Sequence, residues 1–278
     1  MKLAVSNIAL PAYDHVALLP RVGALGLEGL EVALSRVWRD DPNDPPAAAV
    51  AHYRRAVEAA GLAIVGLHAL FWQVPELGLF RGAAARAETL DFLARLSRIC
   101  ADLGGRTLIY GSAHARQRGD LPVARANAEA IDFFAELARR IAGDGTCLCI
   151  EPLGTVDSDY VNSVREALVL VEAVGHPAFR THLDAKALVQ AGEVDEATFA
   201  RARATAAHFH ANEPDLGVLG SSGAVDHTRL GALLRGIGYS GFVSIEQRMT
   251  EGDPLAGIAR SAAVLRRAYG DARAPASA

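Results

Sequence analysis

The feature that most constrains the fold of this chain is a regular alternation of short apolar runs with longer amphipathic segments. Apolar runs of about four to eight residues are typical of buried strands, whereas apolar residues repeated roughly every three to four positions are typical of helices. Strands that alternate with helices pair in parallel, because each helix carries the chain back across the sheet. Eight such units occur within the 278 residues. This number and this length predict an α/β fold, a single closed (β/α)8 TIM barrel.

The expected elements follow one another in order along the chain. The eight strands are expected at residues 3–9, 27–34, 62–69, 107–110, 146–150, 179–183, 207–210 and 242–245. The helices are expected near residues 14–25, 47–60, 84–103, 123–141, 163–174, 197–204, 226–235 and 254–269. A doubly wound open sheet is the alternative, but the glycine-rich turn that usually follows its first strand is missing. We therefore predict one catalytic barrel domain over residues 1–270 and a frayed tail over residues 271–278.

Composition and charge narrow the class of protein. Apolar residues make up 51% of the chain, enough for a large core. The 28 Lys and Arg against 32 Asp and Glu leave a net charge of −4, so a nucleic-acid partner is not expected. No apolar run approaches the roughly 20 residues of a membrane helix, and the N-terminus lacks the apolar stretch of a signal peptide. We therefore expect a cytoplasmic protein that makes no membrane contact.

Four consecutive expected strands end in side chains that bind cations. In chain order these are Glu151, Asp184, His210 and Glu246. Because the C-terminal ends of barrel strands surround one axis, these side chains can meet at one point, where unpaired carboxylates would repel one another and take up protons. Each residue alone is typical of a helix cap or a surface group, but four in succession favour one divalent metal site. Three carboxylates and an imidazole suit Mn²⁺ best, while Co²⁺, Mg²⁺ and Zn²⁺ remain alternatives.

The same strand ends resemble those of a known family. The similar runs are Ile150-Glu151-Pro152, His182-Leu183-Asp184, His208-Phe209-His210-Ala211-Asn212-Glu213 and Ser244-Ile245-Glu246. They resemble the metal-binding strand ends of the sugar phosphate isomerase/epimerase family, in the xylose isomerase-like barrel superfamily that includes the ketose 3-epimerases. The resemblance extends to residues 162–163, 166–167 and the glycine-rich stretch 217–226, so it covers nearly the whole chain in order.

The resemblance implies a proton-transfer reaction with Glu151 and Glu246 as the catalytic residues. In the epimerases, two metal-bound glutamates face opposite sides of the substrate. One removes a proton from the carbon next to the carbonyl, and the other returns it to the opposite face or to the adjacent carbon. A cation at the carbonyl and neighbouring hydroxyl oxygens would stabilise the enediolate between these steps. We therefore expect an isomerase or epimerase of a sugar or sugar phosphate.

We expect four further residues to contact the substrate: His68, Trp72, Lys186 and Glu213. His68 and Trp72 follow the third strand, where a ring beside a polar pocket suits the face of a sugar; an ordinary core role is the alternative. Lys186 follows Asp184 and suits a substrate carboxylate, phosphate or hydroxyl, or else a solvated ion pair. Glu213 closes the run after the seventh strand that resembles the family.

Two histidines and one glutamate are expected deeper in the barrel. His182 and His208 each lie two residues before an expected ligand and so share its face of the strand. This position favours hydrogen bonds to the ligands over direct metal binding. Glu31, within the second strand, could reach the pocket floor or form a salt bridge inside the barrel.

Two positions depart from the ketose 3-epimerases, and one basic loop allows two interpretations. The family's substrate-binding His and Arg are replaced by Ala187 and Leu216, which disfavours 3-epimerisation of a free ketose but leaves the metal site intact. His114, Arg116 and Arg118 form a basic loop after the fourth strand. A solvated loop is the simpler interpretation, and a site for a phosphate or carboxylate is the alternative.

The same residues leave other functions open. A metal-dependent lyase or dehydratase of a keto-sugar or keto-polyol is the closest alternative, since loss of a β-substituent can follow the same proton abstraction. A hydrolase like the abasic-site endonucleases of this superfamily is disfavoured, because those use a three-metal cluster and a basic DNA-binding face. A non-catalytic binding protein is disfavoured by the intact set of ligands. We expect a small carbohydrate-like substrate, a role in carbohydrate metabolism and, from the resemblance alone, a homodimer or homotetramer.

Overall fold

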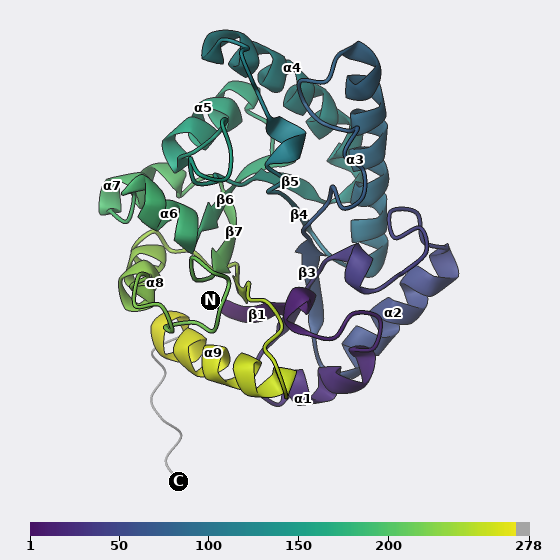
Figure 1. Ribbon diagram of the computed structural model, residues 1–278, viewed down its shortest axis with the longest axis vertical. Helices are drawn as coiled ribbons and strands as arrows, with labels where there is room; N and C mark the ends of the chain where they lie inside the picture. Colours follow the sequence, from purple (N-terminus) through teal and green to yellow (C-terminus); the bar gives the residue numbers. More distant parts are fainter. Residues whose placement is uncertain (271–278) are drawn as a thin grey trace.

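The computed structural model describes residues 1–270 and shows eight parallel strands closed into a barrel (Figure 1). Each strand pairs with its neighbours in chain order, and the last strand pairs with the first. The strands are β1 (Lys2–Ser6), β2 (Gly29–Val32), β3 (Ala63–Leu67), β4 (Thr107–Tyr110), β5 (Cys147–Ile150), β6 (Phe179–Asp184), β7 (Ala206–Ala211) and β8 (Phe242–Ile245). The predicted fold class and strand order are confirmed.

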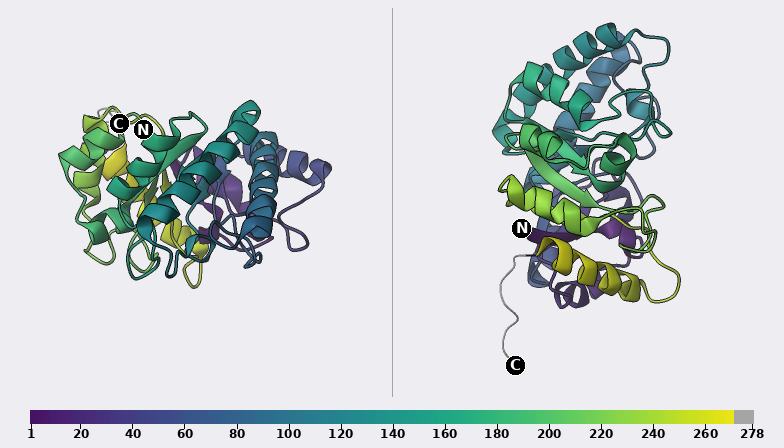
Figure 2. Two further views of the ribbon diagram at one scale, coloured as in Figure 1. Left: turned by 90° about the horizontal axis from the view of Figure 1, so that it is seen from above. Right: turned by 90° about the vertical axis from the view of Figure 1, so that its left-hand side faces the viewer.

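Helices surround the barrel and cover the outer face of the strands (Figures 1 and 2). They are α1 (Leu19–Gly23), α2 (Ala47–Ala59), α3 (Ala83–Leu103), α4 (Val123–Ile141), α5 (Val164–Val174), α6 (Ala185–Ala191), α7 (Glu196–Ala202), α8 (His227–Gly236) and α9 (Pro254–Tyr269). Apolar side chains fill the layer between helices and strands; the rings of Phe134 on α4 and Phe179 on β6 stack with centroids 4.4 Å apart. No helix within residues 1–270 is long and apolar enough to cross a membrane.

The second and third strands are shorter than expected, and three further differences are larger. The first strand ends at Ser6, because Asn7–Ala9 form a 3-10 turn in which the buried Asn7 side chain bonds both backbone groups of Ala33. The first helix is short, with a separate 3-10 turn at Val16–Leu18 before it. A helix that was not predicted, α6, begins directly after β6. The predicted tail at residues 271–278 lies outside the described residues.

The start of α6 bears directly on the candidate site. Asp184, the last residue of β6, is also the N-cap of α6 and accepts a hydrogen bond from the Ala187 backbone N–H at 2.8 Å. A side-chain cap of this kind satisfies one of the free N–H groups at a helix start. The cap uses Oδ1 of Asp184, so the other carboxylate oxygen remains directed toward the barrel axis, where Asn212 and His210 lie.

Candidate metal centre and substrate pocket

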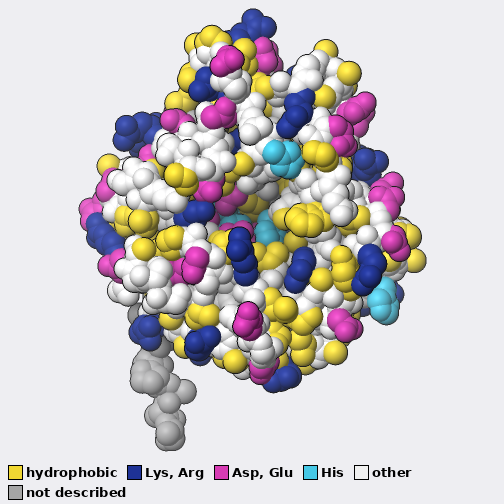
Figure 3. Space-filling model, in the orientation of Figure 1, with side chains coloured by type: hydrophobic (Ala, Val, Ile, Leu, Met, Phe, Trp, Pro, Cys, Tyr) yellow, Lys and Arg dark blue, Asp and Glu magenta, His cyan; other side chains and the backbone are white. Residues whose placement is uncertain are grey.

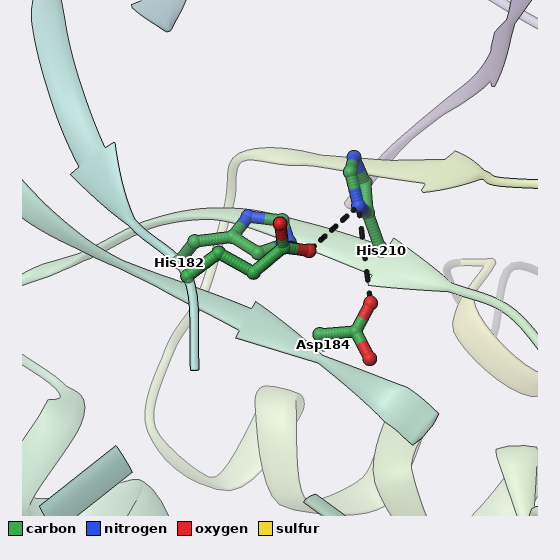
Figure 4. Close-up of side chains that lie close together, drawn as sticks. His182, Asp184 and His210 are labelled. Carbon is green, nitrogen blue, oxygen red and sulfur yellow. Dashed lines mark ion pairs between the residues drawn. The ribbon is translucent and has the colours of Figure 1, made fainter. Parts of the chain in front are cut away.

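One imidazole nitrogen faces three carboxylates at the C-terminal end of the barrel. His210 Nδ1 lies 3.4 Å from Glu151 Oε1, 3.9 Å from Asp184 Oδ2 and 3.5 Å from Glu246 Oε2. Figure 4 shows the His210 ring turned toward Asp184. The structure therefore brings together the four strand-end residues Glu151, Asp184, His210 and Glu246, as their positions after consecutive strands led us to expect.

Burial makes this arrangement electrostatically costly for the protein alone. Burial and the charges of Glu151 and Glu246 together raise the pKa of Asp184 to about 8. Burial also opposes ionisation of Glu151, but His182 and His210 hold the pKa of that carboxyl below its ordinary value. His210 Nδ1 is buried and has no hydrogen-bond partner. Crowded carboxylates and an unpartnered imidazole nitrogen are what a divalent cation would satisfy, so these residues fit a metal ion.

His182 lies closer to the four strand-end residues than the sequence suggested. Glu151, His182, Asp184 and His210 each offer one ligand atom, and these atoms all lie within 4.8 Å of one another. His182 Nε2 is 3.4 Å from Glu151 Oε1, and neither of its ring nitrogens has a hydrogen-bond partner. Burial, with the neighbouring charge of His210, lowers the pKa of His182 to about 3, so the ring is neutral. A neutral imidazole here can orient Glu151 or supply a further ligand atom.

The barrel interior below the four strand-end residues is also polar. Glu31 on β2 is fully buried, and His210 Nε2 lies 2.9 Å from its Oε2. His208 Nε2 lies 3.2 Å from Glu31 Oε1, and Ser244 Oγ donates to Oε2 at 3.0 Å. Burial alone would raise the pKa of Glu31, but His210 and His208 hold it well below its ordinary value. Burial opposes a charge on His210, but Glu31 and Glu246 raise its pKa well above the ordinary value. An ionised Glu31 keeps one proton on Nε2, so a cation would displace the other proton and bind at Nδ1. Of the two expectations for Glu31, the interior network is the one observed.

The pocket at the four strand-end residues has two lobes, which share Gly111, Glu151 and Glu246. The aromatic lobe has a volume of about 330 Å³ and is lined by Ile8, His68, Phe71, Trp72 and His114, among others. The polar lobe has a volume of about 280 Å³ and is lined by Asp157, Asp184, Lys186, Gln190 and Asn212, among others. In Figure 3 a hollow with histidine at its base lies near the middle of this face. Together the lobes are large enough for a sugar-sized molecule.

Three of the four residues expected to contact substrate line this pocket. His68 lines the aromatic lobe; its Nε2 is hydrogen-bonded to Ser6 Oγ at 2.6 Å and its Nδ1 is 3.7 Å from Glu246 Oε1. Trp72 lines the same lobe with 55% of the residue exposed. Lys186 lines the polar lobe, and its ammonium is 2.9 Å from Asp157 Oδ2.

The structure gives Glu213 a different place, and the expected substrate contact is not supported. Its side chain is fully buried and lies outside both lobes. Oε1 accepts hydrogen bonds from the Gly220 backbone N–H at 2.6 Å and from His227 Nε2 at 2.9 Å, while Oε2 accepts one from Ser222 Oγ. Glu213 therefore holds the glycine-rich loop between β7 and α8 in place. The sequence could not reveal this, because the partners come from that loop and from α8.

The basic loop after β4 also differs from the simpler expectation. Arg116 is not solvated but fully buried, and it donates to the backbone carbonyls of Glu151, at 2.6 Å, and Tyr110. It thereby fixes the backbone at the end of β5. Arg118 donates to the backbone carbonyls of Leu121 and Asp159.

Two residues near the site had no role assigned from sequence. Gly111, directly after β4, has no room for a side chain, since a Cβ there would lie 1.7 Å from Glu151 Oε2. Asn212 donates from Nδ2 to Asp184 Oδ2 at 2.6 Å and to Glu246 Oε2 at 2.9 Å. Its place two residues after His210, on the same face of the chain, is the one sequence signal that could have found it.

The fold and site define a TIM barrel with a candidate metal centre at the C-terminal ends of its strands. The chain belongs to the xylose isomerase-like TIM barrel family, whose sequence description matches residues 19–268. No curated protein matches the chain in a sequence comparison.

Solved structures with the same fold include several enzymes that act on sugars. The D-psicose 3-epimerase from Clostridium cellulolyticum H10, solved with D-tagatose, has a TM-score of 0.81 and 17% identity, over 97% of this chain and 99% of that one. An L-ribulose 3-epimerase has a TM-score of 0.79 and 18% identity, over 97% and 95%. The IOLI protein with a bound zinc atom has a TM-score of 0.76 and 16% identity, over 97% and 98%. At these identities the likeness establishes the shared fold.

Proposed function

We propose that this protein is a divalent-metal-dependent isomerase or epimerase of a small carbohydrate, working by proton transfer next to a carbonyl. The observation that carries the proposal is the convergence of three carboxylates on His210 Nδ1, at 3.4 to 3.9 Å, in the mouth of the barrel. The sugar epimerases among the structures of the same fold support the substrate class.

The four strand-end residues would hold the cation. Their donor set of three carboxylates and one imidazole is suited to Mn²⁺, with Co²⁺, Mg²⁺ and Zn²⁺ as alternatives. When bound, such a cation supplies positive charge that lowers the energy of an enediolate. Glu31 keeps the His210 proton on Nε2, and Asn212 orients the carboxylates of Asp184 and Glu246.

Glu151 and Glu246 are the groups we assign to proton transfer. Both line the aromatic lobe and the polar lobe, so a substrate that spans the lobes lies between two carboxylates. One carboxylate removes the proton from the carbon next to the carbonyl, and the other delivers a proton to the opposite face or to the adjacent carbon. Each carboxylate is positioned separately: Arg116 holds the backbone of Glu151, and Asn212 donates to Glu246.

Hydrogen exchange in D₂O tests this proposal. With Mn²⁺ present, we expect a substrate ketose to gain deuterium at the carbon next to its carbonyl, as seen by NMR. Chelation should abolish the exchange and re-addition of the metal should restore it. A protein that binds no divalent cation at millimolar concentration, or that exchanges no ketose or keto-polyol, contradicts the proposal. Loss of water from the substrate would instead support the lyase alternative.

The expected homo-oligomer and cytoplasmic location stay predictions, to be checked by light scattering and by cell fractionation.

A further inference from the structure

We propose that the site takes an uncharged polyhydroxy substrate, not a phosphate or carboxylate, and that the Lys186–Asp157 pair binds its hydroxyl groups. This inference rests on the proposed function and narrows its substrate class. Three features of the described residues carry it: the charges that line the pocket, the backbone N–H groups of the surrounding loops, and the geometry of the Lys186–Asp157 pair.

The charges in the pocket oppose an anionic substrate. Lys186 is the only Lys or Arg among the residues of 1–270 that line either lobe, and Asp157 already pairs with it at 2.9 Å. Glu151, Asp157, Asp184 and Glu246 can carry four negative charges, against three positive charges from Lys186 and a divalent cation. Figure 3 shows Lys and Arg side chains around the hollow. The residues that line the pocket, together with a divalent cation, would thus offer a phosphate no surplus positive charge.

One of the loops that commonly bind phosphate in TIM barrels, the loop after β7, is occupied by the protein's own carboxylates. In such barrels the segments after strands seven and eight commonly supply backbone N–H groups to a phosphate. Here the Gly220 N–H and the Ser222 hydroxyl both donate to Glu213, and the Gly217 N–H donates to Asp215 at 3.0 Å. These donors of the glycine-rich loop after β7 are therefore already bonded to the protein's own carboxylates.

The same arrangement recurs at the start of α5. The backbone N–H groups of Val164 and Arg165 donate to the Glu193 carboxylate at 2.6 and 3.2 Å. A helix start with free N–H groups attracts anions, but Glu193 is 5% exposed and already fills this position.

The loop after β4, for which an anion site was the alternative, is also occupied. The backbone N–H groups of Arg118 and Gly119 donate to the two oxygens of Asp159 at 2.9 and 2.8 Å. The buried Arg116 guanidinium donates to backbone carbonyls. These groups would have to give up an existing partner before they could bind a phosphate.

The Lys186–Asp157 pair suits a hydroxyl group. A hydroxyl both donates and accepts, so it can bridge an ammonium and a carboxylate without separating them. The lysine side chain is 23% exposed and the aspartate 39%, so both can be reached from the pocket. Gln190 lines the same lobe and packs over Gly154, where a Cβ would lie 2.0 Å from Gln190 Oε1. Its amide adds a neutral donor and acceptor beside the pair.

Matched pairs of neutral and phosphorylated sugars test the inference by binding, independently of turnover. The probes are D-fructose with D-fructose 6-phosphate, and D-tagatose with D-tagatose 6-phosphate, titrated calorimetrically into the Mn²⁺-loaded full-length protein. We expect the neutral member of a pair to bind at least about tenfold more tightly than its phosphate. A wild-type preference for the phosphorylated member, or failure of both neutral sugars to bind, would overturn the inference.

Two variants test whether the Lys186–Asp157 ion pair determines the preference for the neutral sugar. Asp157→Asn removes the charge that neutralises Lys186, so it should shift the preference toward the phosphorylated member by about tenfold. Lys186→Met should weaken binding of the neutral sugar by a similar factor. Glu251→Gln removes one exposed acidic charge outside both lobes and is the matched control, expected to leave the ratio unchanged. An unchanged ratio in a folded Asp157→Asn protein refutes the role of the pair.

The two proposals can fail separately. If the wild-type protein binds the neutral sugars with the expected preference but exchanges no deuterium, the result counts against the proposed function alone.

Discussion

The two halves of the barrel mouth differ sharply in chemistry. The strand ends of β5–β8 carry the four strand-end residues together with Asn212 and Lys186. The segments after β1–β4 carry mainly apolar and aromatic groups, including Ile8, Phe71 and Trp72. Both halves share the same strand–helix architecture, so the difference arises from the side chains at the strand ends.

The comparison shows how each half is supported. On the charged half, Asp184, His210 and Glu246 each have at least one hydrogen-bond partner within the protein, from Ala187, Glu31 or Asn212. On the aromatic half, Trp72 is largely exposed and stands at the pocket wall. Substitutions in the charged half should therefore affect the reaction itself, whereas substitutions in the aromatic wall should affect substrate binding.

The largest expected effect comes from the two carboxylates assigned to proton transfer. Glu151→Gln and Glu246→Gln should each lower kcat by about 10²–10⁴-fold, the usual contribution of a positioned acid or base. Steady-state kinetics on a substrate ketose measures this, with metal content determined in parallel. If either variant kept more than a tenth of wild-type kcat at full metal loading, that residue would not be an acid or base in the reaction.

Gly111 links the two halves, because it follows β4 yet leaves room for Glu151. A Cβ at this position would lie 1.7 Å from Glu151 Oε2, so Gly111→Ala should displace the carboxylate. A displacement of about 1 Å can cost on the order of 10²-fold in rate. Gly143→Ala is the matched control, since nothing lies within 4 Å of a Cβ there. Equal activity of the two variants would show that the position of Glu151 is not critical.

The raised pKa of Asp184, in the charged half, predicts that the stability of the metal-free protein depends on pH. The pKa of Asp184 is raised from 3.8 to about 8, so the folded state keeps a proton that the unfolded chain has already lost. This contribution to stability is complete below pH 3.8 and declines as pH rises toward 8, by up to about 1.4 kcal/mol per pH unit. His182, whose pKa is lowered from 6.5 to about 3, acts in the opposite direction, but only below about pH 6.5.

Thermal unfolding of chelator-treated protein between pH 6.5 and 8 measures this effect together with that of His210. Burial opposes a charge on His210, but Glu31 and Glu246 raise its pKa well above the ordinary value, so its contribution to stability also declines as pH rises. The melting temperature should fall as pH rises in this window, and Asp184→Asn should make this fall less steep, because one of the two titrating groups is gone. Metal affinity should rise over the same window, since a cation must displace the proton from Asp184. A melting temperature that rises with pH in the wild-type protein would contradict the raised pKa.

The smallest expected effect is in the aromatic half. Trp72→Ala should raise KM several-fold with little change in kcat, because the indole contributes to binding the ground state and the transition state alike. Since 55% of Trp72 is exposed, the free energy of unfolding should change by no more than about 1 kcal/mol. A fall in kcat at unchanged KM would instead place the ring close to the reacting carbons.

The sequence alone determined the strand order and which residues stand at the strand ends. Period and length of the apolar runs are local properties, so they give the eight units directly. Because a closed parallel barrel brings successive strand ends together, the convergence of Glu151, Asp184, His210 and Glu246 followed from their positions in the chain. The helix α6 escaped prediction because it begins without a loop, using Asp184 itself as its cap.

Only the tertiary structure decided which partner each polar side chain takes. Glu31 meets His210 across 179 positions of the chain, and Arg116 meets the Glu151 carbonyl across 35. Hydrogen bonds of this kind depend on packing distances of a few tenths of an ångström, which no local pattern specifies. For the same reason Glu213 could be expected in the pocket and is found beneath a loop, whereas Lys186 is found paired with Asp157.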